Sequence, residues 1–339
     1  MVLAHRAVRD QILRNTAMSS SDAVVLFDVG AGQAKGGREF QEDRVTIVLP
    51  EQFPAETKEK LAFFAIYDGH GSGLVSEHAS KQLHHLLTKR PEFQKGDYAA
   101  AIKAALADED ALLLESFRND STEPAISGST AAVCLVNLTQ GELVVSNLGD
   151  SHVILAERDP KTDRPYHIRR LTEAHKPGVP SERRRIEEAG GEVTMRSGIA
   201  RLGETIMTEE EGVGSLNMSR ALGDLQYKNP VNEVKDSSCM PRVRRLSSSS
   251  NAVRGDFLSN DPYTSRRTLQ PDRRYLLVVM SDGVSDRTDD VALVQHVIKL
   301  AMRGMRASEI AKEVTTNSTR SVKSDNASCI VAMLDGQRA

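Results

Sequence analysis

The stretch LAFFAIYDGHG, residues 61–71, joins a short apolar run to an acidic turn. A run of this length that stops at Asp-Gly is typical of a buried strand leading into a turn. We therefore expect the carboxylate of Asp68 at the end of a strand, where a stiff core leaves it little rotamer freedom.

Two other apolar runs have the same form. ELVVSNL, residues 142–148, is followed by Gly149-Asp150, and YLLVVM, residues 275–280, is followed by Ser281-Asp282-Gly283. Carboxylates fixed in this way can hold a hard cation such as Mg²⁺ or Mn²⁺, which prefers oxygen ligands and keeps several waters. In such a site Asp68 can supply oxygens to two ions, and Gly69 has no side chain to crowd its carbonyl.

Each acidic turn taken alone is weak evidence for a metal site. Asp-Gly after a strand is usually only a turn, and Asp150 has the alternative role of a turn or capping residue. The hypothesis depends on the combination of turns. Two ions about 3.5–4 Å apart can lower the pKa of a shared water and hold the oxygens of an in-line displacement at phosphorus.

The remaining pattern predicts an α+β sandwich rather than a βαβ barrel. Apolar residues at helical spacing indicate helices, and short β-branched runs indicate an antiparallel meander. We expect helices at 72–90, 97–118 with Asp97 as its cap, 181–189 begun by Ser181, 289–301 and 307–318, the meander at 129–137, 142–147 and 152–156, and a last strand at 328–334.

Composition is that of an ordinary globular protein. The 339 residues are 39% apolar and 27% charged, with a formal net charge of −3, so nothing favours binding to nucleic acid or to a membrane. No apolar run reaches about 18 residues, the length of a spanning helix. The cysteines Cys134, Cys239 and Cys329 lack CxxC spacing, which argues against disulfides and structural zinc and fits a reducing compartment.

Two segments lack a regular pattern. We interpret residues 1–22 as an N-terminal extension, whose arginines fit an amphipathic helix and leave a mitochondrial presequence open. Residues 231–260 lack periodicity and predict a flexible basic loop. Within it, Arg244-Arg245-Leu246-Ser247 is similar to a target of basophilic kinases.

Eight motifs, in order along residues 30–335, resemble those of the metal-dependent protein phosphatases of type 2C, a family of serine/threonine phosphatases. They are Arg38-Glu39-Phe40-Gln41-Glu42-Asp43, Tyr67-Asp68-Gly69-His70-Gly71, Ser127-Gly128-Ser129-Thr130-Ala131, Asn147-Leu148-Gly149-Asp150-Ser151, Leu171-Thr172 with His175-Lys176-Pro177, Ser219-Arg220-Ala221-Leu222-Gly223-Asp224, Ser281-Asp282-Gly283 and Asp325-Asn326.

The resemblance implies a fold and an activity. The fold is a four-layer α/β/β/α sandwich of two antiparallel β-sheets flanked by helices, formed by one catalytic domain over residues 23–337, with a flap inserted near 203–213. The activity is hydrolysis of phosphoserine and phosphothreonine in proteins by a water that two Mg²⁺ or Mn²⁺ ions activate. A weaker third ion and the absence of a covalent intermediate belong to the same expectation.

The resemblance also implies roles for particular residues. Asp68 would bridge two ions with the Gly69 carbonyl as a further ligand, Arg38 would grip the substrate phosphate with its planar fork, and His70 would protonate the leaving oxygen. The other expected metal residues are Glu42, Asp43, Asp282 and Asp325, with Asp150 and Asp286 orienting waters or holding the third ion. The chain departs from the family pattern at Ser72, His152 and Glu173-Ala174 and has no tryptophan, but it lacks none of the metal acids.

Two other interpretations stay open. The chain could be a catalytically inactive member that acts as a regulatory binding module, which the intact metal acids argue against. It could instead hydrolyse a small phosphorylated metabolite. For the leading interpretation we expect phosphorylated proteins as partners, a monomer, and a location in the cytoplasm or the nucleus.

Overall fold

The computed structural model describes residues 22–119, 121–162, 165–203, 207–208, 211–212, 215–233 and 253–338. The first 21 residues, Cys239, the Arg244–Ser247 motif and most of the expected flap and basic loop lie outside this part of the chain. Cys134 and Cys329 are buried free thiols. No helix in the described ranges is long and apolar enough to cross a membrane.

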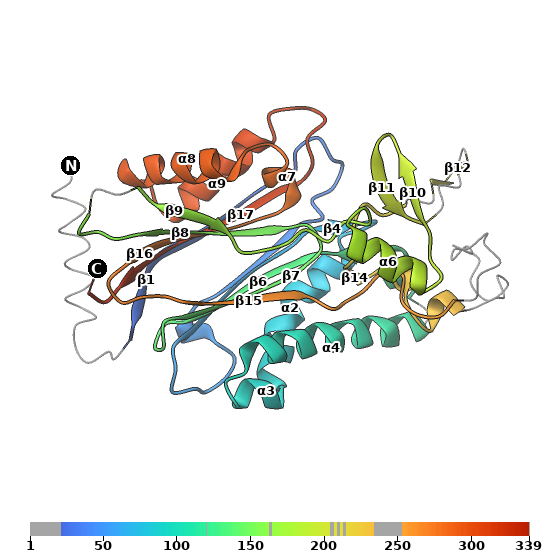
Figure 1. The fold of residues 1–339 in the computed structure, drawn as a ribbon, viewed down its shortest axis with the longest axis horizontal. Coiled ribbons are helices and arrows are strands. Elements are labelled where there is room, and N and C mark those ends of the chain that lie inside the picture. Colours follow the sequence, from blue (N-terminus) through green and yellow to red (C-terminus); the bar gives the residue numbers. More distant parts are fainter. Residues whose placement is uncertain are drawn as a thin grey trace.

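Two five-stranded antiparallel sheets form the centre of the molecule (Figure 1). The first sheet has the order β15 (Tyr263–Thr268), β7 (Glu142–Leu148), β6 (Ala131–Asn137), β3 (Leu61–Tyr67) and β2 (Arg44–Val48). The second has the order β1 (Val24–Ala34), β17 (Ala327–Gly336), β16 (Arg274–Met280), β8 (His152–Arg158) and β9 (His167–Arg170).

Helices cover the outer face of each sheet, so the molecule has four layers. α2 (Leu74–Lys89) and α4 (Tyr98–Arg118) pack on the first sheet, and α8 (Asp290–Met302) and α9 (Ala307–Ser318) pack on the second. A third apolar cluster fills the space between the sheets. Strands such as β3 are apolar on both faces because each face is covered by one of these clusters.

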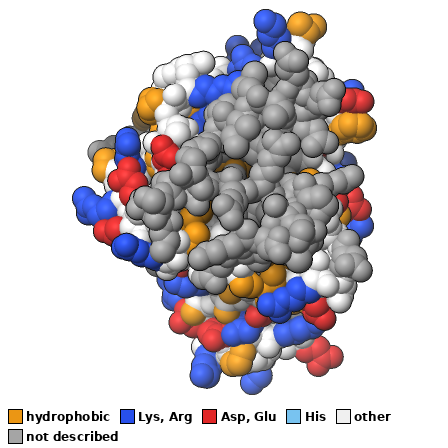
Figure 2. Space-filling view, turned by 90° about the vertical axis from the view of Figure 1, so that its right-hand side faces the viewer, with side chains coloured by type: hydrophobic (Ala, Val, Ile, Leu, Met, Phe, Trp, Pro, Cys, Tyr) orange, Lys and Arg blue, Asp and Glu red, His pale blue; other side chains and the backbone are white. Residues whose placement is uncertain are grey.

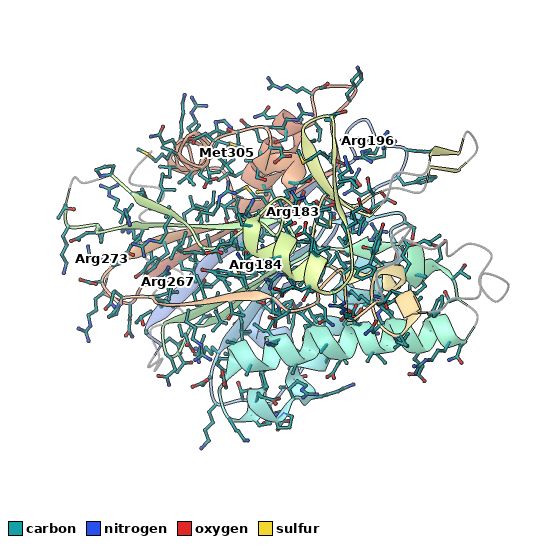
Figure 3. All side chains as sticks on the ribbon, turned by 45° about the vertical axis from the view of Figure 1, so that its right-hand side comes forward. Arg183, Arg184, Arg196, Arg267, Arg273 and Met305 are labelled. Atoms are coloured by element: carbon teal, nitrogen blue, oxygen red, sulfur yellow. The ribbon has the colours of Figure 1, made fainter. Side chains whose placement is uncertain are left out.

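Several short elements surround this sandwich. They are the 3₁₀ turns η1 (Pro50–Gln52), η2 (Leu225–Tyr227) and η3 (Val231–Glu233), the helices α3 (Pro91–Gln94), α5 (Glu123–Ile126), α6 (Pro180–Glu188) and α7 (Asp282–Ser285), and the strands β4 (Gly69–His70), β5 (Gly128–Ser129), β10 (Val193–Arg196), β11 (Ile199–Leu202), β12 (Met207–Thr208), β13 (Glu211–Gly212) and β14 (Leu222–Gly223). α6 carries Arg183 and Arg184 at one end of the sandwich, and Arg196 lies on the β10–β11 hairpin (Figure 3).

The same end of the molecule carries charges of both signs. In the face drawn in Figure 2, basic and acidic side chains are interspersed around the residues that the structure does not describe.

The structure confirms the predicted sandwich but corrects two details. The expected meander is wrong at its third strand, because β8 leaves the sheet of β6 and β7 and pairs with β16 instead. Gly149, at φ +104°, turns the chain there, so that Val145 and Val153 enter the inter-sheet core from opposite sheets. The helix expected to begin with Ser181 begins at Pro180, and no side chain caps it. Asp97 caps α4 by accepting from the Ala100 amide, as predicted.

Candidate metal centre

The acids that follow or precede core strands gather at one end of the two sheets. Asp43 precedes β2 and Asp68 follows β3 in the first sheet; Asp282 follows β16 and Asp325 precedes β17 in the second, and Asp150 lies on the turn between β7 and β8. Burial raises the pKa of Asp68 well above its usual value, and the carboxylates of Asp43, Asp282, Asp150 and Asp325 raise it further. Like charges have this effect only at short range, so the five acids share one site.

The segment before β2 is fastened to the start of β17 by an amide side chain. Asn326 Oδ1 accepts from the Glu42 backbone N–H at 2.7 Å, and Asn326 Nδ2 donates to the Phe40 carbonyl at 3.0 Å. This holds Glu42 and Asp43 beside the second sheet. Asp43 is fully buried and accepts from Ser281 Oγ at 3.0 Å; burial raises its pKa to about 6.

Asp282 and Asp286 lie at the two ends of the one-turn helix α7. The Asp286 amide donates to the Asp282 carbonyl at 2.8 Å, which places both side chains on one face. A Cβ on Gly283 would lie 1.9 Å from the Asn326 carbonyl oxygen, so only glycine lets α7 pack so closely on β17. Burial, followed by the charges of Asp150 and Asp286, raises the pKa of Asp282 to about 7.

Two basic side chains partly balance this negative charge. Lys176 Nζ pairs with Asp150 Oδ2, and only 2% of Asp150 is exposed. Arg38 Nη2 pairs with Asp325 Oδ2 at 2.6 Å near the surface, where 57% of the Arg38 side chain is exposed. The guanidinium is therefore accessible to an anion from solution.

Gly69 and His70 belong to a small sheet beside the acids. Gly69 pairs with Ser129, and a Cβ at Gly69 would lie 2.6 Å from the Glu42 carbonyl oxygen. His70 Nε2 forms a hydrogen bond with Asp224 Oδ2 at 2.6 Å. Burial alone would lower the pKa of His70, but the charge and hydrogen bond of Asp224, together with the charges of Asp150 and Glu42, outweigh it, so the pKa is raised.

The structure thus brings Glu42, Asp43, Asp68, Gly69, His70, Asp150, Asp282, Asp286 and Asp325 to one end of the sandwich, with Arg38 at its surface. The sequence alone predicted no role for Asn326, Lys176 or Asp224. All three stand inside the motifs given above, and only that position could have indicated a role.

The donor set fits divalent cations. Asp43, Asp68 and Asp282 are buried carboxyls that repel neighbouring acids, and within the described residues Asp43 Oδ1 and Asp150 Oδ1 are buried without a hydrogen-bond partner. Cations would relieve both costs. No three carboxylate, imidazole or thiol side chains of the described ranges converge closely enough to enclose one ion by themselves. A site here would need backbone carbonyl and water ligands as well, which is the usual coordination of Mg²⁺.

Comparisons with known proteins point in one direction. A family model described as protein phosphatase 2C matches residues 27–327. The chain is 26% identical over 336 residues to Protein phosphatase 2C homolog 3 of Schizosaccharomyces pombe, covering 97% of this chain and 69% of that protein. It is 28% identical over 316 residues to Protein phosphatase 2C homolog 2 of Saccharomyces cerevisiae, covering 90% of this chain and 56% of that protein.

The solved structures support the same fold. A serine-threonine phosphatase 2C from Toxoplasma gondii superposes with a TM-score of 0.69 at 19% identity, covering 92% of this chain and 99% of that one. A sex determining protein of Caenorhabditis elegans superposes with a TM-score of 0.66 at 24% identity, covering 91% of this chain and 65% of that one. The chain therefore spans the full length of some relatives and under two thirds of others.

Proposed function

Because this chain belongs to the protein phosphatase 2C family, we propose that it hydrolyses phosphoserine and phosphothreonine in proteins with the help of two Mg²⁺ or Mn²⁺ ions. One observation carries the proposal. Five acids carried by two different sheets and the turn between them meet at one end of the molecule. Asp43 and Asp150 are buried, and four of the acids act on Asp68 by charge repulsion. An accessible arginine and a histidine lie beside them.

The residues that would hold the ions follow from this arrangement. Asp68 lies among the other acids and can reach more than one ion, and Gly69, Glu42, Asp282 and Asp325 surround it. Asp150 and Asp286 raise the pKa of Asp282, and both also act on Lys176. These two acids would serve a weaker third ion. When bound, such ions lower the pKa of a water and neutralise charge on phosphate oxygens.

The chain's own side chains supply substrate binding and proton transfer. Arg38 offers two parallel N–H donors to phosphate oxygens and would exchange its contact with Asp325 for the substrate. His70 lies beside Glu42 and Asp150 and would give a proton to the oxygen of the leaving serine or threonine.

The two alternatives make different demands on the site. An inactive binding module does not need a full set of buried acids, and their mutual repulsion costs stability in the absence of a cation. Hydrolysis of a small metabolite would use the same acids, so only the substrate separates it from the leading proposal.

The direct test is hydrolysis of a phosphothreonine peptide with Mn²⁺ by wild type, Asp68→Asn and Asp282→Asn. Each substitution is expected to lower kcat/KM about 100-fold or more, because it removes an ion ligand. Asp272→Asn is the matched control, since Asp272 lies at the opposite end of β16 from Asp282. Activity that survives EDTA would refute the proposal, and a preference for sugar phosphates over peptides would favour the metabolite alternative.

A further inference from the structure

The His70 ring is held on one side only. Its Nε2 atom contacts Asp224 Oδ2 at 2.6 Å, whereas its Nδ1 atom is buried and has no hydrogen-bond partner among the described residues. A buried polar atom without a partner is costly, so such an atom usually meets a ligand or an ordered water. Nδ1 is therefore the ring nitrogen that can form a hydrogen bond with a molecule bound beside the acids.

Three motifs that are far apart in the sequence build the contact between His70 and Asp224. β4, β5 and β14 form one small antiparallel sheet in which Gly128 of β5 pairs with both His70 and Gly223. A Cβ on Gly128 would lie 2.1 Å from Asp224 Oδ2 and 2.7 Å from His70 Nε2. Glycine at position 128 therefore lets the carboxylate and the imidazole meet.

The backbone of Asp224 is fixed in an uncommon conformation. Its φ of 49° and ψ of 42° are left-handed, which among residues with a side chain Asn and Asp tolerate best. The Asp224 amide donates to the Ser127 carbonyl at 2.7 Å, and the Tyr227 amide donates to the Asp224 carbonyl at 2.9 Å. These bonds aim the side chain at His70.

A buried ion pair secures the strand before Asp224. The Asp110 carboxylate accepts from the Gly223 amide at 2.8 Å and from Lys228 Nζ at 2.5 Å. Lys228 Nζ also donates to the Ala221 carbonyl at 2.7 Å, so α4 and the segment around β14 are joined at several points. Asp224 is itself only 1% exposed, which shields its charge from solvent.

We propose that Asp224 is the positioning residue for His70: it holds Nε2–H and so presents Nδ1 to the leaving oxygen of the substrate. This inference rests on the proposed phosphatase function. As a water oxygen bonds to phosphorus, the bond from phosphorus to the serine or threonine oxygen breaks. That oxygen takes the electron pair and the Nδ1 proton, and the phosphate product keeps the protons of the water. The neutral ring remains held at Nε2 and takes a new proton from solvent.

Asp224→Asn tests this role with little change to the backbone, because Asn also tolerates the left-handed conformation. We expect kcat for a phosphothreonine peptide to fall about 100-fold, the lower end of a general acid's contribution. For p-nitrophenyl phosphate we expect kcat to stay within about fivefold of wild type, since nitrophenolate leaves without a proton and gains little from an acid. The Asp224→Asn/His70→Gln double variant should be no slower on the peptide than His70→Gln alone.

Asp261→Asn is the matched control, because Asp261 is half-exposed and pairs with Lys103 and Arg220 rather than with His70. It should leave the ratio of the two activities unchanged. If Asp224→Asn lowers both activities equally, or neither, the positioning role is wrong while the phosphatase proposal stands. If wild type with Mn²⁺ hydrolyses neither substrate, the proposed function fails.

A spectroscopic readout is independent of activity. In wild type labelled with ¹⁵N-histidine, the nitrogen spectrum should show His70 carrying its proton at Nε2 at a pH where the ring is neutral. Asp224→Asn should change that pattern. A wild-type ring protonated at Nδ1 alone would overturn the inference, even if the variant failed to fold.

Discussion

Lys176 brings positive charge to the buried acids. The Lys176 side chain is 38% exposed, and its ammonium contacts the buried Asp150. Burial would lower the pKa of Lys176, but Asp150, Asp282 and Asp286 together outweigh this effect, so the pKa is raised. The ammonium would therefore compete with a divalent ion for these carboxylates.

Lys176→Met is expected to tighten the weakest divalent ion site about tenfold, which corresponds to about 1.4 kcal/mol. Titration calorimetry with Mn²⁺ measures this directly. Lys81→Met is the control, since Lys81 makes an exposed pair with Glu77 on α2. An unchanged or weaker affinity in Lys176→Met would show that the ammonium helps to shape the site instead of competing for it.

The residues of the candidate site differ in how readily they can be predicted from the sequence. The acids were predictable because each stands beside an apolar run or in a recognisable motif. The partner of His70 was not, because Asp224 is 154 positions away and nothing in their spacing connects them. The same holds for Asn326, which is 284 positions from the amide of Glu42 that it binds.

At the level of elements, burial decided what could be predicted. β3, β6, β7 and β16 are continuous apolar runs that the core covers on both sides, and their positions were predicted correctly. β15 alternates between exposed and half-exposed residues at the edge of its sheet, and it resembles a loop in sequence. The two-residue strands β4, β5 and β14 have no periodicity, so only the folded chain reveals them.

Gly128→Ala tests the close packing of these short strands. The new Cβ must push the Asp224 carboxylate away from His70, and we expect a loss of about 1–3 kcal/mol in the free energy of unfolding. Peptide hydrolysis should fall more than p-nitrophenyl phosphate hydrolysis. Gly255→Ala is the control, because the nearest atom to its Cβ would be 3.7 Å away. Wild-type stability and activity in Gly128→Ala would contradict the packing argument.

Glu182 of α6 anchors the segment that leads to β14. Its carboxylate is 4% exposed and accepts from Ser219 Oγ at 2.7 Å and from Arg220 Nε at 3.0 Å. Glu182→Gln would remove the buried carboxylate partner of Arg220 and leave it only the more exposed Asp261. This should lower the free energy of unfolding by roughly 3 kcal/mol, measured by urea unfolding.

Glu187→Gln on the same helix is the comparison, since Glu187 pairs with Arg183 at the surface, where Figure 3 shows that arginine. It should not change stability measurably. Equal effects of the two substitutions would mean that the buried network adds nothing to the fold.

For the whole molecule, the raised pKa values of Asp43, Asp68 and Asp282 link stability to both pH and metal. Between about pH 4 and pH 7 the folded, metal-free protein binds more protons at these acids than the unfolded chain does, so their contribution to stability falls as pH rises. The histidines His84, His152 and His175, whose pKa burial lowers to about 4, act in the opposite direction.

The difference in Tm between Mn²⁺ and EDTA samples removes the histidine contribution, which is common to both. We expect this difference in Tm to widen from pH 5 to pH 7, because the ions bind the ionised acids. The widening should correspond to a few kcal/mol in the free energy of unfolding. Differential scanning calorimetry across the pH series measures it. Asp282→Asn should flatten the trend, and a difference independent of pH would contradict the proposed link.

The acids are divided between the two sheets, and this division has a mechanical consequence. Asp68 moves with one sheet and Asp282 with the other, and an apolar cluster fills the interior between the sheets. A slip of one layer past the other by a fraction of an ångström would change the gaps among the carboxylates. A cation coordinated by carboxylates of both sheets would resist this slip.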